Sequence, residues 1–209
     1  MSTLLHIDSS PRGEQSVSRR FTRRFVTLWK IKHPGDRVIY RDLGRHPVPH
    51  VNEEWISSAF TPPDARLAEQ QQVLSLSDML IDELITSERY VFGVPMYNLS
   101  VPSTFKAYID QVVRIHRTFK YVDGEYQGLL QDKKTLVVTT QGDRSSKTTV
   151  HPLPDFQEPY IRSILGLIGI TDITFVNLDN LEGDREARAQ SISSAKVQVK
   201  QLVKDWSGQ

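Results

Sequence analysis

The sequence predicts a three-layer α/β fold, in which a five-stranded parallel sheet carries helices on both faces. Short apolar runs rich in β-branched residues alternate along the whole chain with longer segments of helical periodicity. This alternation is typical of parallel strands joined by right-handed helical crossovers. The chain has 209 residues, of which 38% are hydrophobic, and this suits one domain with a sizeable core. We therefore expect residues 1–209 to form a single domain.

Five segments are predicted to be strands of this sheet. Four are short apolar runs bounded by polar residues, as strands buried on both faces usually are. They cover residues 3–7, 90–94, 135–140 and 173–177. The remaining segment, residues 37–41, alternates Val38 and Tyr40 with Ile39 and charged neighbours, as an edge strand does.

Helical patterns fill the intervals between the predicted strands. They cover residues 17–32, 65–86, 103–115, 158–167 and 185–206. The second of them shows the apolar stripe of a helix that packs on a core. Residues 47–63 contain four prolines, and we interpret them as an ordered surface connection with room for one short helical turn at residues 53–59.

A hairpin is predicted at residues 119–128, which read FKYVDGEYQG. Asp123 and Gly124 stand between two stretches of alternating aromatic residues. An Asp-Gly pair in this setting is a strong signal of a two-residue hairpin turn. The hairpin interrupts the alternation of strand and helix, so we expect it to leave the main sheet.

Composition excludes several classes of function. The 26 Lys and Arg residues nearly balance the 25 Asp and Glu residues, so the chain lacks the general positive field that binds nucleic acid or an anionic membrane. It contains no cysteine, which excludes disulfides, thiolate metal sites and a cysteine nucleophile. The six histidines lack the spacing of a metal site. Any redox chemistry therefore needs a bound cofactor.

No signal for membrane insertion or secretion is present in the sequence. The apolar run at the N-terminus is too short for a signal peptide, because Asp8 and Arg12 interrupt it. No later run reaches the length of about 18 apolar residues that a membrane span needs. We therefore expect a cytoplasmic protein without a membrane partner.

The first candidate ligand-binding segment follows the first strand. In open α/β sheets a ligand lies beyond the carboxyl ends of the strands, where the strand order reverses. Residues 8–18, called the serine loop below, lead from this edge into a helix and offer hydroxyl and N–H groups to a phosphate. The candidate contacts are Ser10, Ser16, Val17 and Ser18. The alternative interpretation is a helix cap at Ser16 within a serine-rich turn.

The ligand of the serine loop is predicted to carry a single terminal phosphate. The first strand is not followed by Gly-x-Gly-x-x-Gly, and the chain has no Gly-Lys-Ser/Thr, so neither a dinucleotide nor a nucleoside triphosphate is favoured. Flavin mononucleotide, FMN, carries one such phosphate and is the usual ligand at this edge of flavodoxin-like sheets. A basic stripe on the following helix is interpreted as a solvated face that at most attracts the phosphate at long range. Its members are Arg19, Arg20, Arg23 and Arg24.

A second candidate segment, residues 95–102, follows the third predicted sheet strand and is called the Tyr97 turn. It begins and ends with a proline, so its shape is restricted. The residues expected to contact a flavin ring are Met96, Tyr97, Asn98 and Leu99. The alternative interpretation is a turn whose Tyr97 and Leu99 side chains fill the core.

With this turn the sequence resembles the FMN-dependent NADH-azoreductase family, relatives of the eukaryotic NAD(P)H quinone reductases. The resemblance covers essentially the full length of the chain. It depends on Ser-x-Arg-x-x-x-Ser-x-Ser in the serine loop, Pro-Met-Tyr-Asn at residues 95–98 and Leu-Gly-Leu-Ile-Gly-Ile at residues 165–170. It implies a flavodoxin-like sandwich with strand order 2-1-3-4-5, and a homodimer with one FMN per subunit near the subunit interface.

The resemblance also implies a ping-pong reaction. NADH or NADPH passes hydride to FMN and leaves, and a quinone or an aromatic azo compound then takes two electrons at the same place. No side chain is assigned a catalytic role, because the flavin carries the chemistry. Asn98 is placed near flavin N5 or O4, where a hydrogen bond stabilises developing charge. The choice between NADH and NADPH and the physiological acceptor stay open.

Two further groups of residues are assigned. The loop after the fourth sheet strand is implied to lie along the pyrimidine and dimethylbenzene side of the flavin, and the alternative is a simple turn. Its residues are Thr140, Gln141, Gly142 and Asp143. The hairpin and residue 167 are expected to form an apolar lid over the substrate pocket, and the alternative is pairing across the hairpin strands. The lid residues are Phe119, Tyr121, Tyr126 and Leu167.

Two other functions stay open at this point. One is a flavodoxin-type electron carrier, which passes single electrons to protein partners and has no NAD(P)H site. Such carriers are commonly strongly acidic, whereas this chain has a net charge of +1. The other is an interaction protein on the same fold that has lost its flavin site, and binding of FMN would exclude it.

Overall fold

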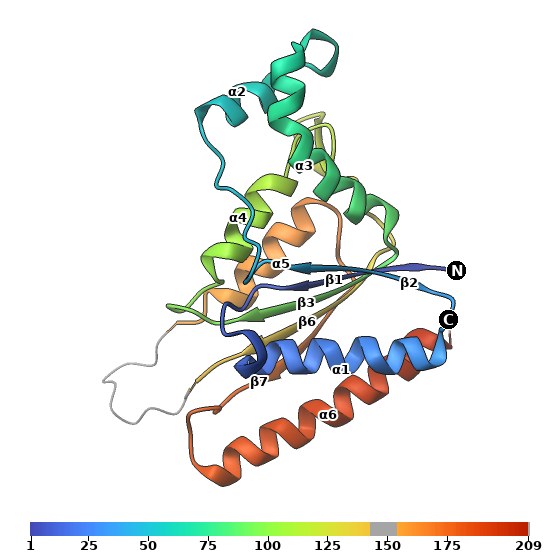
Figure 1. The fold of residues 1–209 in the computed structure, drawn as a ribbon, viewed down its shortest axis with the longest axis vertical. Coiled ribbons are helices and arrows are strands. Elements are labelled where there is room, and N and C mark those ends of the chain that lie inside the picture. The colour runs from blue at the N-terminus through green and yellow to red at the C-terminus, as the bar shows by residue number, and fades with distance from the viewer. Residues whose placement is uncertain (143–153, 209) are drawn as a thin grey trace.

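The computed structural model describes residues 1–142 and 154–208, and these residues form the predicted three-layer sandwich (Figure 1). Its central sheet contains β1 (Thr3–Asp8), β2 (Arg37–Asp42), β3 (Arg89–Pro95), β6 (Lys134–Thr140) and β7 (Ile173–Leu178). Every neighbouring pair is parallel, and the order is β2-β1-β3-β6-β7. When only these five strands are counted, this order is 2-1-3-4-5. The parallel sheet of five strands is therefore confirmed, and its order reverses between β1 and β3.

Helices cover both faces of the sheet (Figure 1). One face carries α1 (Val17–Lys32) and α6 (Arg185–Ser207), and the other carries α3 (Ala68–Thr86), α4 (Ser103–Val112) and α5 (Gln157–Leu167). The short α2 (Glu53–Phe60) packs against α3 beyond the sheet. Single 3₁₀ turns at Gly13–Gln15 and Pro63–Ala65 precede α1 and α3.

Two helix ends differ from the prediction by three residues, and the start of α5 and the end of α6 differ by one. α3 begins at Ala68 rather than at residue 65, because Pro63–Ala65 forms a separate 3₁₀ turn. α4 ends at Val112 rather than at residue 115. There the Thr118 hydroxyl accepts a hydrogen bond from the Arg114 N–H at 3.0 Å and donates one to the Val112 carbonyl at 2.8 Å. This hydroxyl satisfies backbone groups that the end of a helix leaves without partners.

Each face of the sheet has its own apolar core. Tyr90 and Phe92 of β3 are buried with Phe105 of α4 in the cluster under α3, α4 and α5. Val91, which lies between them in sequence, is buried on the opposite face with Phe25 of α1. Successive side chains of a strand point to opposite faces, so a strand covered on both sides is apolar at every position. For this reason continuous apolar runs identified the central strands.

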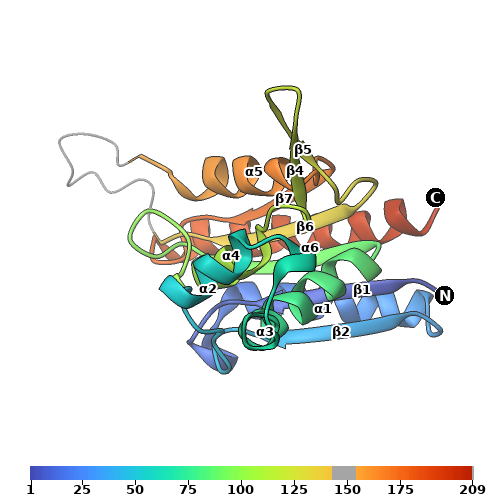
Figure 2. The same ribbon diagram turned by 90° about the horizontal axis from the view of Figure 1, so that it is seen from above.

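The predicted hairpin is present as β4 (Phe119–Val122) and β5 (Glu125–Gly128), a separate two-stranded sheet that projects from the body (Figure 2). Asp123 and Gly124 have positive φ angles of 52° and 88°, as a type I′ turn requires. At the root of the hairpin, a Cβ atom on Gly128 would lie 2.0 Å from the backbone nitrogen of Gly169. The hairpin therefore packs on the segment after α5 through a close contact of two glycine backbones.

None of the helices in residues 1–142 and 154–208 combines the length and apolar character that a bilayer span needs. Within the same residues, no three side chains of His, Cys, Asp or Glu gather closely enough to hold a metal ion.

Candidate functional site

A pocket opens at the carboxyl ends of β1, β3 and β6, beside the point where the strand order reverses. Its volume is about 370 Å³, within the usual range of small-molecule sites. The predicted cofactor-binding residues that line it are Ser10, Ser16, Val17, Met96, Tyr97, Thr140, Gln141 and Gly142. Three segments that are distant in sequence meet here because parallel strands end at the same edge of the sheet.

The other predicted contacts lie outside this lining. Ser18 is buried in the first turn of α1, directly behind Ser16. Asn98 and Leu99 form the tip of the Tyr97 turn. Asp143 lies outside the described residues.

Six residues that the sequence did not assign also line the pocket: Arg12, Gln15, Pro95, Leu181, Glu182 and Arg188. Arg12 and Gln15 belong to the serine loop, and Pro95 begins the Tyr97 turn. The last three come from the loop after β7 and the first turns of α6. One sequence signal was available for them. Because β7 runs parallel to the other strands, the residues after Leu178 approach the same edge of the sheet.

The serine loop presents buried hydroxyls at the N-terminus of α1. The Ser16 hydroxyl accepts a hydrogen bond from the Arg19 N–H at 3.3 Å and lies 3.1 Å from the Ser18 hydroxyl. The side chains of Ser10, Ser16 and Ser18 are almost fully buried. Capping and anion binding are compatible here, because the other N–H groups of the first turn and the positive helix end remain available. This arrangement suits one phosphate group.

Charged side chains border the same pocket. Arg12 of the serine loop and Arg188 of α6 are both exposed at its rim. Glu182 lies beside Gly142, where an added Cβ atom would meet the Glu182 Oε2 at 3.1 Å. The described lining thus carries two cations and one carboxylate, which favours an anionic ligand.

The Tyr97 turn is tight and strained at its tip. Tyr97 and Ser100 exchange backbone hydrogen bonds of 2.9 and 3.1 Å. The two residues between them, Asn98 and Leu99, have positive φ angles of 50° and 67°. Asn tolerates this region and Leu rarely adopts it, so Leu99 is a backbone outlier of the kind that gathers at functional sites. The Met96 N–H donates to the Thr140 carbonyl at 2.8 Å and joins this turn to the end of β6.

The side chains of Gln141 and Gln157 anchor the loop after β6 and the end of β3. The Gln141 Nε2 donates to an Asp155 carboxylate oxygen at 3.0 Å, and the other oxygen of Asp155 accepts the Gln157 N–H at 2.8 Å. The fully buried Gln157 side chain donates to the Val94 carbonyl at the end of β3 at 2.9 Å. The start of α5 therefore fixes two of the three strand ends that form the pocket.

The predicted lid residues lie away from the pocket of their own chain. Tyr121 and Tyr126 are 56% and 67% exposed and pair across the hairpin with ring centroids 5.1 Å apart. Phe119 contacts the same Tyr126 ring. Leu167 ends α5, whereas Gln157 at the opposite end of this helix contacts the pocket edge. At 1.5 Å per residue, the two ends are separated by roughly 15 Å.

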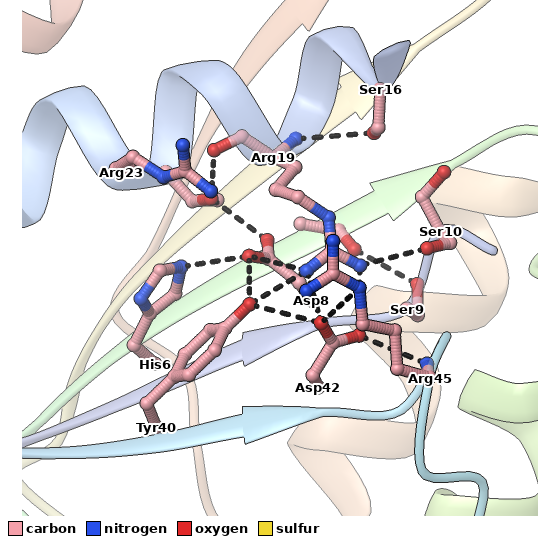
Figure 3. A network of polar contacts seen from close by, with 12 residues as sticks. His6, Asp8, Ser9, Ser10, Ser16, Arg19, Arg23, Tyr40, Asp42 and Arg45 are labelled. Atoms are coloured by element: carbon pink, nitrogen blue, oxygen red, sulfur yellow. Dashed lines mark hydrogen bonds and ion pairs between the residues drawn. The ribbon is translucent and has the colours of Figure 1, made fainter. Parts of the chain in front are cut away.

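The basic stripe on α1 is only partly a solvated face, so that interpretation is wrong for one of its members. Arg20, Arg23 and Arg24 are exposed, but Arg19 is only 2% exposed and lies beneath the serine loop (Figure 3). Burial disfavours its charge, yet the hydrogen bond to Asp42 and the negative charge of Asp8 raise the pKa of Arg19 above its ordinary value. Charge runs are usually solvated, and nothing local distinguishes the buried member.

The fold and the pocket together define a flavodoxin-like protein, with a pocket at the switch point of a parallel sheet. A family model described as flavodoxin-like fold matches residues 2–203. The chain belongs to this family, and the resemblance drawn from its motifs is confirmed by curated relatives.

Two curated relatives come from Trichormus variabilis. "FMN-dependent NADH:quinone oxidoreductase 2" is 50% identical over 207 residues, covering 99% of this chain and 100% of the relative. "FMN-dependent NADH:quinone oxidoreductase 1" is 53% identical over 203 residues, covering 97% of this chain and 96% of the relative. Among solved structures, an azoreductase from Bacillus anthracis superposes with a TM-score of 0.87 at 24% identity, covering 98% of this chain and 100% of that one. This last likeness supports the fold.

Proposed function

We propose that this protein is an FMN-dependent NADH:quinone oxidoreductase that passes two electrons from NADH through bound FMN to quinones and to aromatic azo compounds. The observation that carries the proposal is the meeting of the serine loop, the Tyr97 turn and the loop after β6 around one pocket. The names of the curated relatives, which cover almost the whole chain, support the same cofactor and reaction.

The residues of the pocket fit FMN. The Ser16 hydroxyl, the N-terminus of α1 and the Arg12 side chain suit the single phosphate of this cofactor, and the Ser18 hydroxyl supports Ser16 from behind. Met96 and Tyr97 offer apolar surface to a planar ring system. The chemistry that FMN supplies when bound is acceptance of hydride and its delivery to an oxidant.

The chain's own contribution is binding and positioning. The serine loop would hold the phosphate, and the Tyr97 turn and the residues Thr140, Gln141 and Gly142, which line the same pocket, would contact the ring. Asn98, at the tip of the Tyr97 turn, would offer its amide to the polar edge of the ring near N5 or O4, where a donor stabilises developing charge. No protein side chain needs to change its covalent state. Because NADH and the acceptor would both react with the flavin, they would use the same pocket in turn.

We also propose a homodimer in which the hairpin of the second subunit covers the pocket. The hairpin projects from the body (Figure 2) and carries two exposed tyrosines. No residue of the hairpin lines the pocket of its own chain. A second copy of the chain would then supply the lid formed by Phe119, Tyr121, Tyr126 and Leu167.

Sedimentation velocity of the FMN-loaded protein tests the dimer. We expect a species of twice the chain mass of 23.9 kDa. Replacement of Tyr121 and Tyr126 by serine should raise KM for a quinone severalfold and leave the FMN affinity unchanged, because these side chains are placed on the substrate side. A monomer at micromolar concentration, or unchanged kinetics in the variant, would contradict the arrangement.

The proposed reaction is tested by anaerobic reduction of the FMN-loaded protein with NADH and, separately, with NADPH, followed by addition of a benzoquinone or an azo dye. We expect NADH to bleach the flavin absorbance and the acceptor to restore it at a rate equal to turnover. The comparison of the two nucleotides identifies the preferred donor. If FMN binds but neither nucleotide reduces it, the protein is an electron carrier of the flavodoxin type. If FMN does not bind, the proposed function is wrong.

A further inference from the structure

A buried ionic cluster lies directly beneath the serine loop and joins it to β2 (Figure 3). The Arg19 guanidinium donates to both carboxylate oxygens of Asp42, at 2.5 and 2.8 Å. Its Nη2 also donates to the Ser10 carbonyl at 2.8 Å. The Arg19 side chain is 2% exposed and that of Asp42 is 8% exposed. One side chain thus connects α1, the end of β2 and the backbone of the serine loop.

The positive charge of Arg19 is balanced inside this cluster. Asp8 lies 3.6 Å from the guanidinium, so two buried carboxylates face Arg19, and the exposed Arg45 side chain lies 3.7 Å from one of them, Asp42. The Tyr40 hydroxyl accepts a hydrogen bond from Arg19 at 2.6 Å and donates to Asp8 at 3.1 Å, and the Thr22 hydroxyl donates to Asp8 at 2.8 Å. Little of the charge remains to attract a phosphate above the cluster. A role in anion binding must therefore be geometric.

The geometric role concerns the orientation of the Ser10 carbonyl oxygen. Ser10 precedes Pro11, which has no N–H group, so the peptide unit between them offers an acceptor and no donor. A carbonyl oxygen that faced a phosphate would repel it. Arg19 donates a hydrogen bond to this oxygen on the buried side of the loop, whereas Ser10 lines the pocket on the opposite side. The loop thus turns its acceptor inward and leaves donors for the ligand.

We propose that Arg19 and Asp42 are positioning residues, which hold the Ser10 carbonyl away from the ligand and so give the serine loop its preference for a phosphate monoester. This inference rests on the proposed binding of FMN at that loop. Arg19→Lys separates a geometric role from a role of charge. Lysine keeps the charge, so the preference for FMN would persist if charge alone mattered. Lysine cannot form the planar two-pronged contact with Asp42 while also reaching Ser10, so the preference should be lost if geometry matters.

The test compares FMN with riboflavin, which has the same ring but no phosphate. Dissociation constants of both flavins are measured by quenching of flavin fluorescence for the wild-type protein and for Arg19→Lys. We expect the constant for FMN to rise about 10- to 100-fold and that for riboflavin to change less than about threefold. The preference for FMN over riboflavin is a readout that general destabilisation does not move.

Arg20→Lys is the matched control, since Arg20 is the exposed neighbour of Arg19 on the same helix, and it should leave both constants unchanged. Tyr40→Phe removes one contact that orients Arg19 and should lower the FMN preference about two- to fivefold, which keeps the inference testable if Arg19→Lys does not fold. Retention of the full FMN preference in folded Arg19→Lys or Tyr40→Phe, or equal losses for both flavins, would overturn it. Failure of the wild-type protein to bind FMN would instead refute the proposed function.

Discussion

Replacement of both Ser16 and Ser18 by alanine is expected to raise the dissociation constant for FMN about 10- to 100-fold. Their hydroxyls are buried and lie 3.1 Å apart at the N-terminus of α1. A hydrogen bond to a charged group contributes about 1.5–3 kcal/mol, so the loss of the Ser16 bond to a phosphate, together with the Ser18 hydroxyl that lies against it, is large. The riboflavin affinity should stay nearly constant, because riboflavin has no phosphate. Titration of the protein with each flavin measures both effects.

Asn52→Ala is the control for the helix-capping role of Ser16. Asn52 caps α2, where its side chain accepts a hydrogen bond from the Trp55 N–H at 2.8 Å, and α2 lies outside the pocket lining. Loss of either cap should lower the free energy of unfolding by about 1 kcal/mol. Only the serine variant should lose FMN. If it binds FMN as tightly as the wild-type protein, the phosphate lies elsewhere.

Gly44→Ala is expected to lower the free energy of unfolding by roughly 3 kcal/mol and to weaken FMN binding at the same time. A Cβ atom at this position would lie 2.1 Å from the carbonyl oxygen of Ser10 and 2.5 Å from its carbonyl carbon. Both are backbone atoms, so the connection after β2 or the serine loop must move. Urea denaturation of the protein without flavin, together with a flavin titration, measures the two consequences.

Gly166→Ala is the matched control for this substitution. Gly166 lies in α5, and an added Cβ atom there would have nothing within 4 Å. Because alanine favours the helix over glycine, this variant should be more stable by roughly 0.5–1 kcal/mol and should bind FMN normally. Equal stability of Gly44→Ala and the wild-type protein would contradict the close contact between the two loops.

Much of the fold could be predicted because its signals are local. α1 begins where predicted, since Ser16 supplies a helix cap immediately before Val17. The hairpin was predicted because Asp123 and Gly124 are residue types that accept positive φ. The end of α4 could not be predicted in the same way. It depends on the Thr118 hydroxyl, six residues beyond Val112, which returns to bind the backbone of the last turn.

The same distinction between local signals and contacts of distant residues applies to the candidate site. The serine loop and the Tyr97 turn were predicted because each follows a strand whose apolar run is evident in the sequence. Parallel strands then place both segments at one edge of the sheet. Leu181, Glu182 and Arg188 were missed because no local pattern distinguishes them from other surface residues, although the loop after β7 reaches the same edge.

The sequence by itself determined the type of fold, three of the segments that meet at the pocket and the cofactor that they favour. These depend on hydrophobic periodicity and on motifs within a few residues of each strand end. Only the tertiary structure decided that Arg19 is buried while Arg20 is exposed, and that Arg19 joins Asp42 to the Ser10 carbonyl. Burial and ion pairing depend on which distant segments pack around a side chain. Adjacent arginines on one helix therefore look alike in the sequence and take different roles in the folded protein.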